Sequence, residues 1–136
     1  MLVLLVAGPV GGLPADDVRA ALQQGWARGA PADVLSAPGG PDDDGEPDLV
    51  LVAVDVLGAE ALAPGGELAE AAGTAAAAGA PLLVVAREVR AGARECGAAG
   101  VAEVHALPAG TSPAGEGVAR AVADRCADLA RTWSPS

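Results

Sequence analysis

Three charged residues directly follow apolar segments that have the composition of buried strands. Asp55 comes after a run that ends at Val54, and Arg87 and Glu88 follow a run that ends at Ala86. In an open parallel sheet, ligands bind in the crevice outside the carboxyl ends of the strands. These are the only polar side chains at adjacent predicted strand ends that could act there. Asp55, Arg87 and Glu88 are therefore candidate ligand-binding residues.

Glycine-rich segments follow two other apolar runs. Backbone N–H groups of such a segment can bind an anion, and residues 8–12 stand between a predicted strand and a predicted helix. This segment matches neither GxxxxGK[ST] nor GxGxxG, and the acidic Asp16 and Asp17 downstream repel phosphate. A tight turn that needs small residues is the favoured alternative. The glycine candidates for ligand binding are Gly8, Gly11, Gly12, Gly39 and Gly40.

Asp55 also stands where a response-regulator receiver domain has its phospho-acceptor. Such a domain needs an acidic pair after its first strand to bind Mg²⁺ and a lysine after its fifth. The corresponding first-strand end here is Ala7-Gly8, and the chain contains no lysine. We therefore interpret Asp55 as a solvated turn residue or a helix-capping acid.

The remaining reactive residue types do not form a recognisable site. Asp42–Asp44 with Glu46 lack the D-x-D-x-D-G register of a calcium loop. Cys96 and Cys126 lie 30 positions apart and form no CxxC pair, so we interpret them as thiols in a reducing cytoplasm. His105, the only histidine, stands in an apolar run and is expected to be a core or edge residue. We assign no catalytic residue and no metal site.

Composition excludes two classes of partner. The 136 residues carry 18 acidic and 8 basic side chains, a net charge of −10, whereas nucleic-acid binding needs clustered cations. No segment reaches the roughly 18 continuous apolar residues that cross a bilayer. The apolar residues 1–7 lack a basic flank and are expected to form a strand rather than a signal peptide. We expect one cytoplasmic domain over residues 1–136, binding neither nucleic acid nor membrane.

Short apolar runs alternate with alanine-rich segments, which predicts repeated strand-helix units. The expected fold is a three-layer α/β/α sandwich around a doubly wound, mainly parallel five-stranded sheet, Rossmann-like or flavodoxin-like. Residues 37–47 are rich in helix breakers and are expected to form a flexible loop. The predicted strands are Leu2–Ala7, Ala32–Ser36, Asp48–Val54, Pro81–Ala86 and Val101–Ala106. The predicted helices begin at Pro14, cover Glu67–Ala78 and Val89–Ala98, and run from Pro113 to Trp133.

The order of these segments resembles the bacterial glycerate kinases that phosphorylate D-glycerate with ATP. The closest likeness is between residues 48–58 and the family pattern DLVITGEGRLD, and residues 80–89 and 97–107 resemble later family segments. The family's opening strand, its loop APDSFKGSLSA and the start of the following helix fall on residues 6–18. Its ADGGEGT motif falls on residues 37–42 with both glycines kept. The resemblance implies a glycerate-kinase-like core domain, with the family's second domain missing at residues 37–47.

The positions that carry chemistry in this family differ here. The resemblance places the family's Asp, Ser and Lys at Ala7, Gly8 and Val10, and its closing Asp at Gly58. Phosphoryl transfer needs such charges to hold the metal and the transferring group. The resemblance therefore implies a non-catalytic module that needs no cofactor.

Three functions follow from these observations. The first is a glycerate-kinase-like binding or protein-interaction module, acting through an unidentified protein partner or through self-association. The second is a residual or split glycerate kinase subunit, which would use ATP and Mg²⁺ with Asp55, Arg87 and the glycine-rich segments. The third is a structural homo-oligomer or complex subunit.

Overall fold

The computed structural model describes residues 1–37, 46–66, 68–108 and 115–133. In this part of the chain five strands form one sheet in the order β2-β1-β3-β4-β5, and every strand pair is parallel. The strands are β1 (Leu2–Ala7), β2 (Val34–Ser36), β3 (Leu49–Leu57), β4 (Leu82–Val89) and β5 (Glu103–Ala106).

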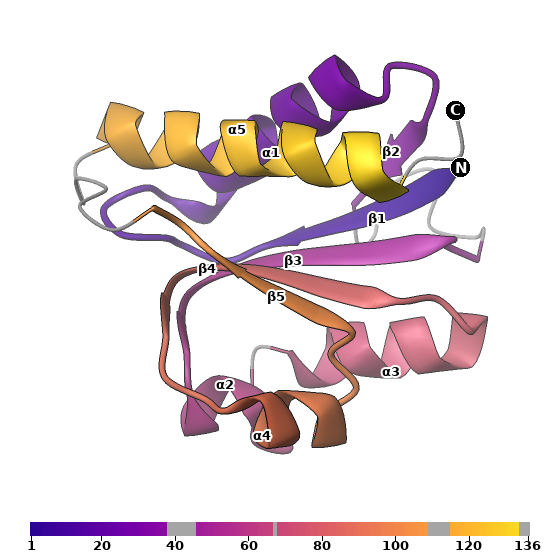
Figure 1. Cartoon of the computed structure of the whole chain (residues 1–136), viewed down its shortest axis with the longest axis vertical. Helices are drawn as coiled ribbons and strands as arrows, with labels where there is room; N and C mark the ends of the chain where they lie inside the picture. Colours follow the sequence, from indigo (N-terminus) through magenta and orange to yellow (C-terminus); the bar gives the residue numbers. More distant parts are fainter. Residues whose placement is uncertain (38–45, 67, 109–114, 134–136) are drawn as a thin grey trace.

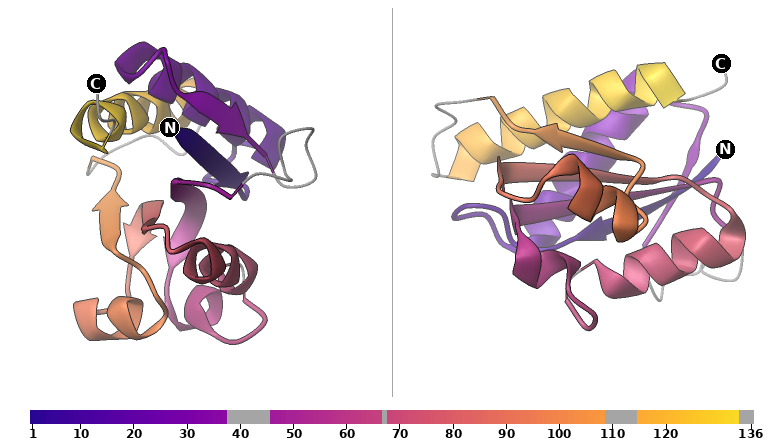
Figure 2. Two further views of the ribbon diagram at one scale, coloured as in Figure 1. Left: turned by 90° about the vertical axis from the view of Figure 1, so that its right-hand side faces the viewer. Right: turned by 60° about the horizontal axis from the view of Figure 1, so that its bottom comes forward.

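Helices cover both faces of this sheet. In Figure 1, α1 and α5 lie on one face, and α2, α3 and α4 lie on the other. The views of Figure 2 show the same three layers from the side. The predicted three-layer, doubly wound α/β/α fold is therefore confirmed. The helices are α1 (Ala15–Gly29), α2 (Ala59–Leu62), α3 (Ala69–Ala78), α4 (Ala93–Ala98) and α5 (Gly115–Trp133).

The central strands are buried on both faces, which explains their unbroken apolar sequence. Along β3, Leu49, Leu51 and Ala53 belong to the core cluster under α1 and α5. Val50 and Val52 alternate with them and belong to the cluster under the other three helices. The sheet therefore separates two apolar cores.

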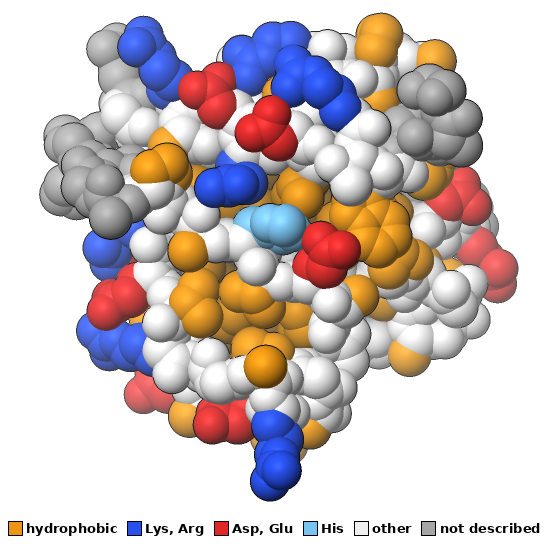
Figure 3. Space-filling view, in the orientation of Figure 1, with side chains coloured by type: hydrophobic (Ala, Val, Ile, Leu, Met, Phe, Trp, Pro, Cys, Tyr) orange, Lys and Arg blue, Asp and Glu red, His pale blue; other side chains and the backbone are white. Residues whose placement is uncertain are grey.

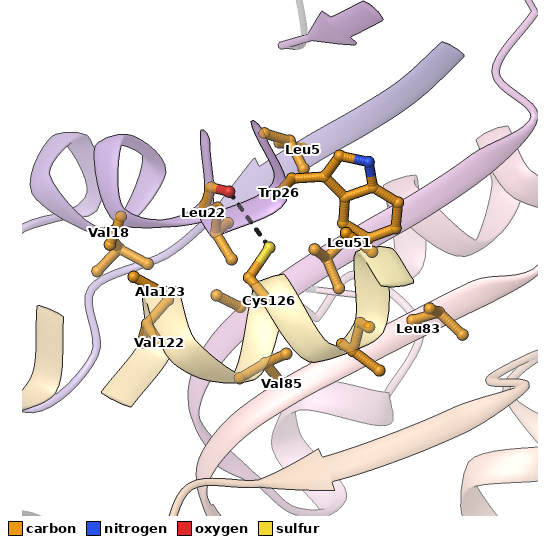
Figure 4. Packing of buried hydrophobic residues seen from close by; sticks show 14 of the residues in the cluster. Leu5, Val18, Leu22, Trp26, Leu51, Leu83, Val85, Val122, Ala123 and Cys126 are labelled. Atoms are coloured by element: carbon orange, nitrogen blue, oxygen red, sulfur yellow. Dashed lines mark hydrogen bonds between the residues drawn. The ribbon is translucent and has the colours of Figure 1, made fainter. Parts of the chain in front are cut away.

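The helices α1 and α5 pack closely on one face. Trp26 is fully buried, and its Nε1 donates to Asp33 Oδ2 at 2.9 Å. Across the helix interface, the Cys126 thiol donates to the Leu22 carbonyl at 3.2 Å (Figure 4). A Cβ added at Gly25 would contact the backbone carbonyl of Ala123. This contact fixes how near the two helices lie.

The predicted ends of two strands and the start of the helix that follows them are wrong for one physical reason. Strands β3 and β4 continue three residues past their predicted ends because Val56 pairs with Glu88 and Leu57 pairs with Val89. Val89 consequently ends β4, and the following helix begins at Ala93 rather than at Val89. The strand predicted over 32–36 is shorter at its start, and the short helix α2 was not predicted.

Two sequence predictions fall largely outside the described residues. They are the flexible loop over 37–47, of which 38–45 are not described, and the helix start at Pro113. Among the residues that are described, no helix is both long enough and apolar enough to cross a membrane.

Candidate functional site

The strand order places the point where the winding of the sheet reverses, which we call the crevice, at the carboxyl ends of β1 and β3. The order 2-1-3-4-5 is that of flavodoxin-type folds, in which the chain winds in opposite directions from this strand pair and ligands bind at the point of reversal. The glycine-rich residues 8–12 follow β1, and Asp55 lies near the end of β3. Three of the predicted candidates, Gly11, Asp55 and Arg87, meet at this point.

Asp55 is held by two elements at once. Its Oδ1 accepts hydrogen bonds from Arg87 Nε at 2.6 Å and from the Gly11 backbone N–H at 2.8 Å. Arg87 Nη2 donates to Asp55 Oδ2 at 3.3 Å, so the ion pair is bidentate. About a third of each side chain is exposed, 39% for Asp55 and 32% for Arg87. Asp55 lies within β3 and the N-cap of α2 is Gly58, so its interpretation as a turn or helix-capping residue is wrong.

The sheet register explains why Asp55 and Arg87 meet. Asp55 lies between two paired positions, Val54 with Ala86 and Val56 with Glu88, so Arg87 is its neighbour on β4. Both side chains continue the alternation of the apolar residues that face α1 and α5. Two residues that read as loop positions in the sequence therefore form a cross-strand ion pair.

The loop after β1 is a tight turn that aims an N–H group at Asp55. Val10 and Leu13 exchange two backbone hydrogen bonds of 3.1 and 2.9 Å, and both side chains are buried in the core under α1. Gly11 takes a φ of +57°, a conformation that favours glycine. The preferred alternative of a tight turn is confirmed, and the anion that its N–H binds is the chain's own carboxylate.

This pairing lowers the pKa of Asp55 below its ordinary value. The hydrogen bond from Arg87 is the largest cause; partial burial acts in the opposite direction, and the Gly11 N–H lowers the pKa further. The same ion pair raises the pKa of Arg87. Both groups therefore stay charged at neutral pH and neutralise each other.

Glu88 does not join this cluster. Successive residues of a strand point to opposite faces, and Glu88 instead accepts hydrogen bonds from Arg90, with Nε to Oε1 at 3.1 Å. Of the three charged candidates, Arg87 therefore pairs with Asp55, whereas Glu88 pairs with Arg90. A hollow of about 380 Å³ lies beside the end of β3 and is lined by Asp55, Arg90 and Glu60, among others.

The other candidates have separate positions. The Gly8 N–H is already used, because it donates to the Ala53 carbonyl at 3.0 Å in the β1–β3 ladder. Gly12 is exposed in the turn. Gly39 and Gly40 lie outside the described residues. The predicted edge position of His105 is confirmed, with Nε2 at 2.7 Å from Glu103 Oε1.

Sequence reasoning missed the hydrogen bond from Gly11 to Asp55, which joins positions 44 residues apart. Within residues 1–37, 46–66, 68–108 and 115–133, no group of three or more His, Cys, Asp or Glu side chains could hold a metal ion. No protein-family model matches the chain, and no similar sequence is found among curated proteins.

Proposed function

We propose that this chain is a non-catalytic binding module that acts through association with a protein chain. The observation that carries the proposal is the closed cluster at the strand ends. Asp55 is neutralised by Arg87 and also accepts the Gly11 N–H, so the three groups satisfy one another. A ligand that used any of them would first have to break a charge-assisted contact.

The resemblance to glycerate kinases supports the same proposal. Its alignment puts the family's lysine at Val10, and the Val10 side chain is 1% exposed and packed in the core. No described cation reaches the crevice from this loop, and Arg87, the cation beside it, is engaged by Asp55. Phosphoryl transfer depends on positive charge placed on the transferring group. The proposal therefore assigns no reaction to this crevice.

We place the module in the cytoplasm. Cys96 and Cys126 are both buried and unpaired thiols, and such thiols persist in reducing compartments. The net charge of −10 supports a partner that is neither nucleic acid nor an anionic membrane surface.

Thermal unfolding with candidate ligands tests this proposal. Purified protein is heated alone, with ATP and Mg²⁺, and with both plus D-glycerate. A ligand present at 100 times its Kd adds about 2.7 kcal/mol to the unfolding free energy. In a domain of this size that corresponds to a Tm increase of about 10 °C. We expect no increase.

The alternative of a residual or split kinase predicts the opposite result. It would place ATP in the hollow beside the end of β3, whose charged lining residues are Asp55, Glu60 and Arg90. A saturable Tm increase that disappears in both Asp55→Ala and Arg90→Ala would favour that alternative and overturn the proposal of a non-catalytic module.

A further inference from the structure

The outer edge of β5 is open among the described residues and adjoins an apolar hollow. β5 is the last strand of the sheet, and a hollow of about 490 Å³ is lined by residues of β4, α4 and β5, Val104 among them, and by Val101 between α4 and β5. Val89, also in this lining, is 38% exposed. β5 is the strand nearest the viewer in Figure 1, and in the same view hydrophobic side chains gather below the chain's only histidine (Figure 3). Among the described residues, this edge therefore has no neighbouring strand and lies beside an apolar surface.

The backbone N–H and C=O of Val104 point away from β4, toward the open edge of the sheet. The Leu107 N–H donates to the Ala86 carbonyl at 2.9 Å, which continues the regular ladder between β5 and β4. Successive residues of a strand turn their backbone groups alternately toward a neighbour and away from it. His105 and Glu103 therefore direct theirs to β4, and Val104 directs its N–H and C=O to the open edge. The Ala106 carbonyl likewise points away from β4, where it accepts a hydrogen bond from Arg125 of α5 at 3.4 Å.

The side chains of β5 separate into a charged and an apolar face. Glu103 and His105 pair in register with Leu83 and Val85, so they lie on the face of α1 and α5. Val104 lies on the opposite face, in the lining of the hollow. The edge thus presents one acid and one histidine on one face, two residues apart, with a valine between them on the other.

We propose that β5 pairs with β5 of a second copy of this chain, antiparallel, about a two-fold axis at Val104. This inference names the partner of the binding module proposed above and rests on that proposal. The two Val104 residues would exchange both backbone hydrogen bonds. The ten strands of two copies would then form one continuous sheet.

Hydrogen-bond complementarity supports this register. A two-fold axis at Val104 puts Glu103 of each copy directly opposite His105 of the other, and an imidazole N–H that donates to a carboxylate across facing strands stabilises the pair. These are non-hydrogen-bonded positions, where the side chains of facing strands approach most closely. Nδ1 of His105 has no partner among the described residues, whereas Nε2 contacts Glu103 of its own chain. The imidazole N–H of His105 could therefore be donated to Glu103 of either copy.

Other pairings are less favourable on the same grounds. An axis at His105 would place the two histidines opposite each other and would use the Ala106 carbonyl that Arg125 contacts. The other sheet edge, β2, has only three residues and no charged side chain. The pairing at Val104 also brings the two apolar hollows to the same face of the joined sheet, where each adjoins the seam.

Substitution and exchange of Glu103 and His105 test the inference. Mass is measured by light scattering over a dilution series at about 0.15 M salt, where a Debye length of about 8 Å screens the net charges. The wild-type chain should reach twice its mass of 13.1 kDa. His105→Glu puts carboxylates opposite one another and should weaken the dimer at least about tenfold. The double variant Glu103→His/His105→Glu again puts a carboxylate opposite an imidazole at each position and should restore the dimer.

Two controls separate this seam from general effects. Ala77→Glu adds the same charge on the exposed side of α3 and should leave the dimer unchanged. Circular dichroism checks that each variant is folded. A monomeric wild-type chain, a dimer unaffected by His105→Glu, or a double variant that stays monomeric would each overturn the inference. None of these outcomes affects the proposed function, which fails only if nucleotide or glycerate binds at the crevice.

Discussion

Replacing Gly25 with alanine should destabilise the protein even though alanine is the better helix former. A Cβ at this position would contact the Ala123 carbonyl and lie 2.9 Å from the Ala123 Cα, both in the backbone of α5. A backbone atom cannot rotate away as a side chain can, so α1 and α5 would have to separate. Forced overpacking of this kind costs about 1–3 kcal/mol, and the gain in helix propensity, about 1 kcal/mol, offsets part of this cost. We expect a net loss of up to about 2 kcal/mol.

Gly73 provides a matched control for the same chemical change. It lies within α3, and a Cβ added there would have no heavy atom within 4 Å. Gly73→Ala should therefore stabilise the protein by about 0.5–1 kcal/mol, the usual gain in an exposed helix interior. The assay is urea unfolding followed by circular dichroism, with both variants compared to the wild type. Gly25→Ala as stable as Gly73→Ala would refute the close packing of α1 on α5.

Two further predictions concern titratable groups. Because the folded pKa of Asp55 is lowered by Arg87, the ion pair stabilises the fold above the unfolded pKa of about 3.9 and loses this effect as the pH falls through the folded pKa. The stability difference between wild type and Asp55→Asn in urea unfolding should therefore shrink as the pH is lowered from 6 through this range; a constant difference would contradict the ion pair. Burial raises the pKa of Cys126 to about 12. In a Cys96→Ser variant, a thiol reagent at about pH 8 should therefore label Cys126 only after denaturant is added, and rapid labelling of the native protein would contradict its burial.

The sheet was predictable because its central strands are continuous apolar runs. Their ends were not, because Asp55 and Arg87 have the composition of loop residues and are kept in the strands by pairing with each other. The same effect explains why α4 begins later than predicted. Val89 pairs with Leu57 and therefore belongs to β4. Strand ends set by cross-strand contacts leave little local signal in the sequence.

The candidate site was predictable in part. Topology alone brings the loop after β1 beside the end of β3, so the proximity of Gly11 and Asp55 follows from the strand order. That Gly11 donates to Asp55, and not to an external anion, depends on a positive φ and on the turn closed by Val10 and Leu13. Sequence patterns indicate a turn there but not where its N–H points.

The opposite orientation of Arg87 and Glu88 could have been anticipated. Two adjacent side chains can point to the same side only in a loop. Within a strand, successive side chains point to opposite faces of the sheet. The apolar run ends at Ala86, which suggested a loop from Arg87 onward. The observed strand ends at Val89, and the two side chains consequently have different partners, Asp55 and Arg90.

The central claim is that the crevice between β1 and β3 is closed by the chain's own carboxylate. Amide chemical shifts of ¹⁵N-labelled protein, followed while inorganic phosphate, ATP with Mg²⁺, or D-glycerate is added, test it most directly. We predict no saturable shift of the Gly11 amide with any of the three, and a shift of that amide when the pH falls through the pKa of Asp55. Saturable movement of the Gly11 amide with an added anion at neutral pH would contradict the claim.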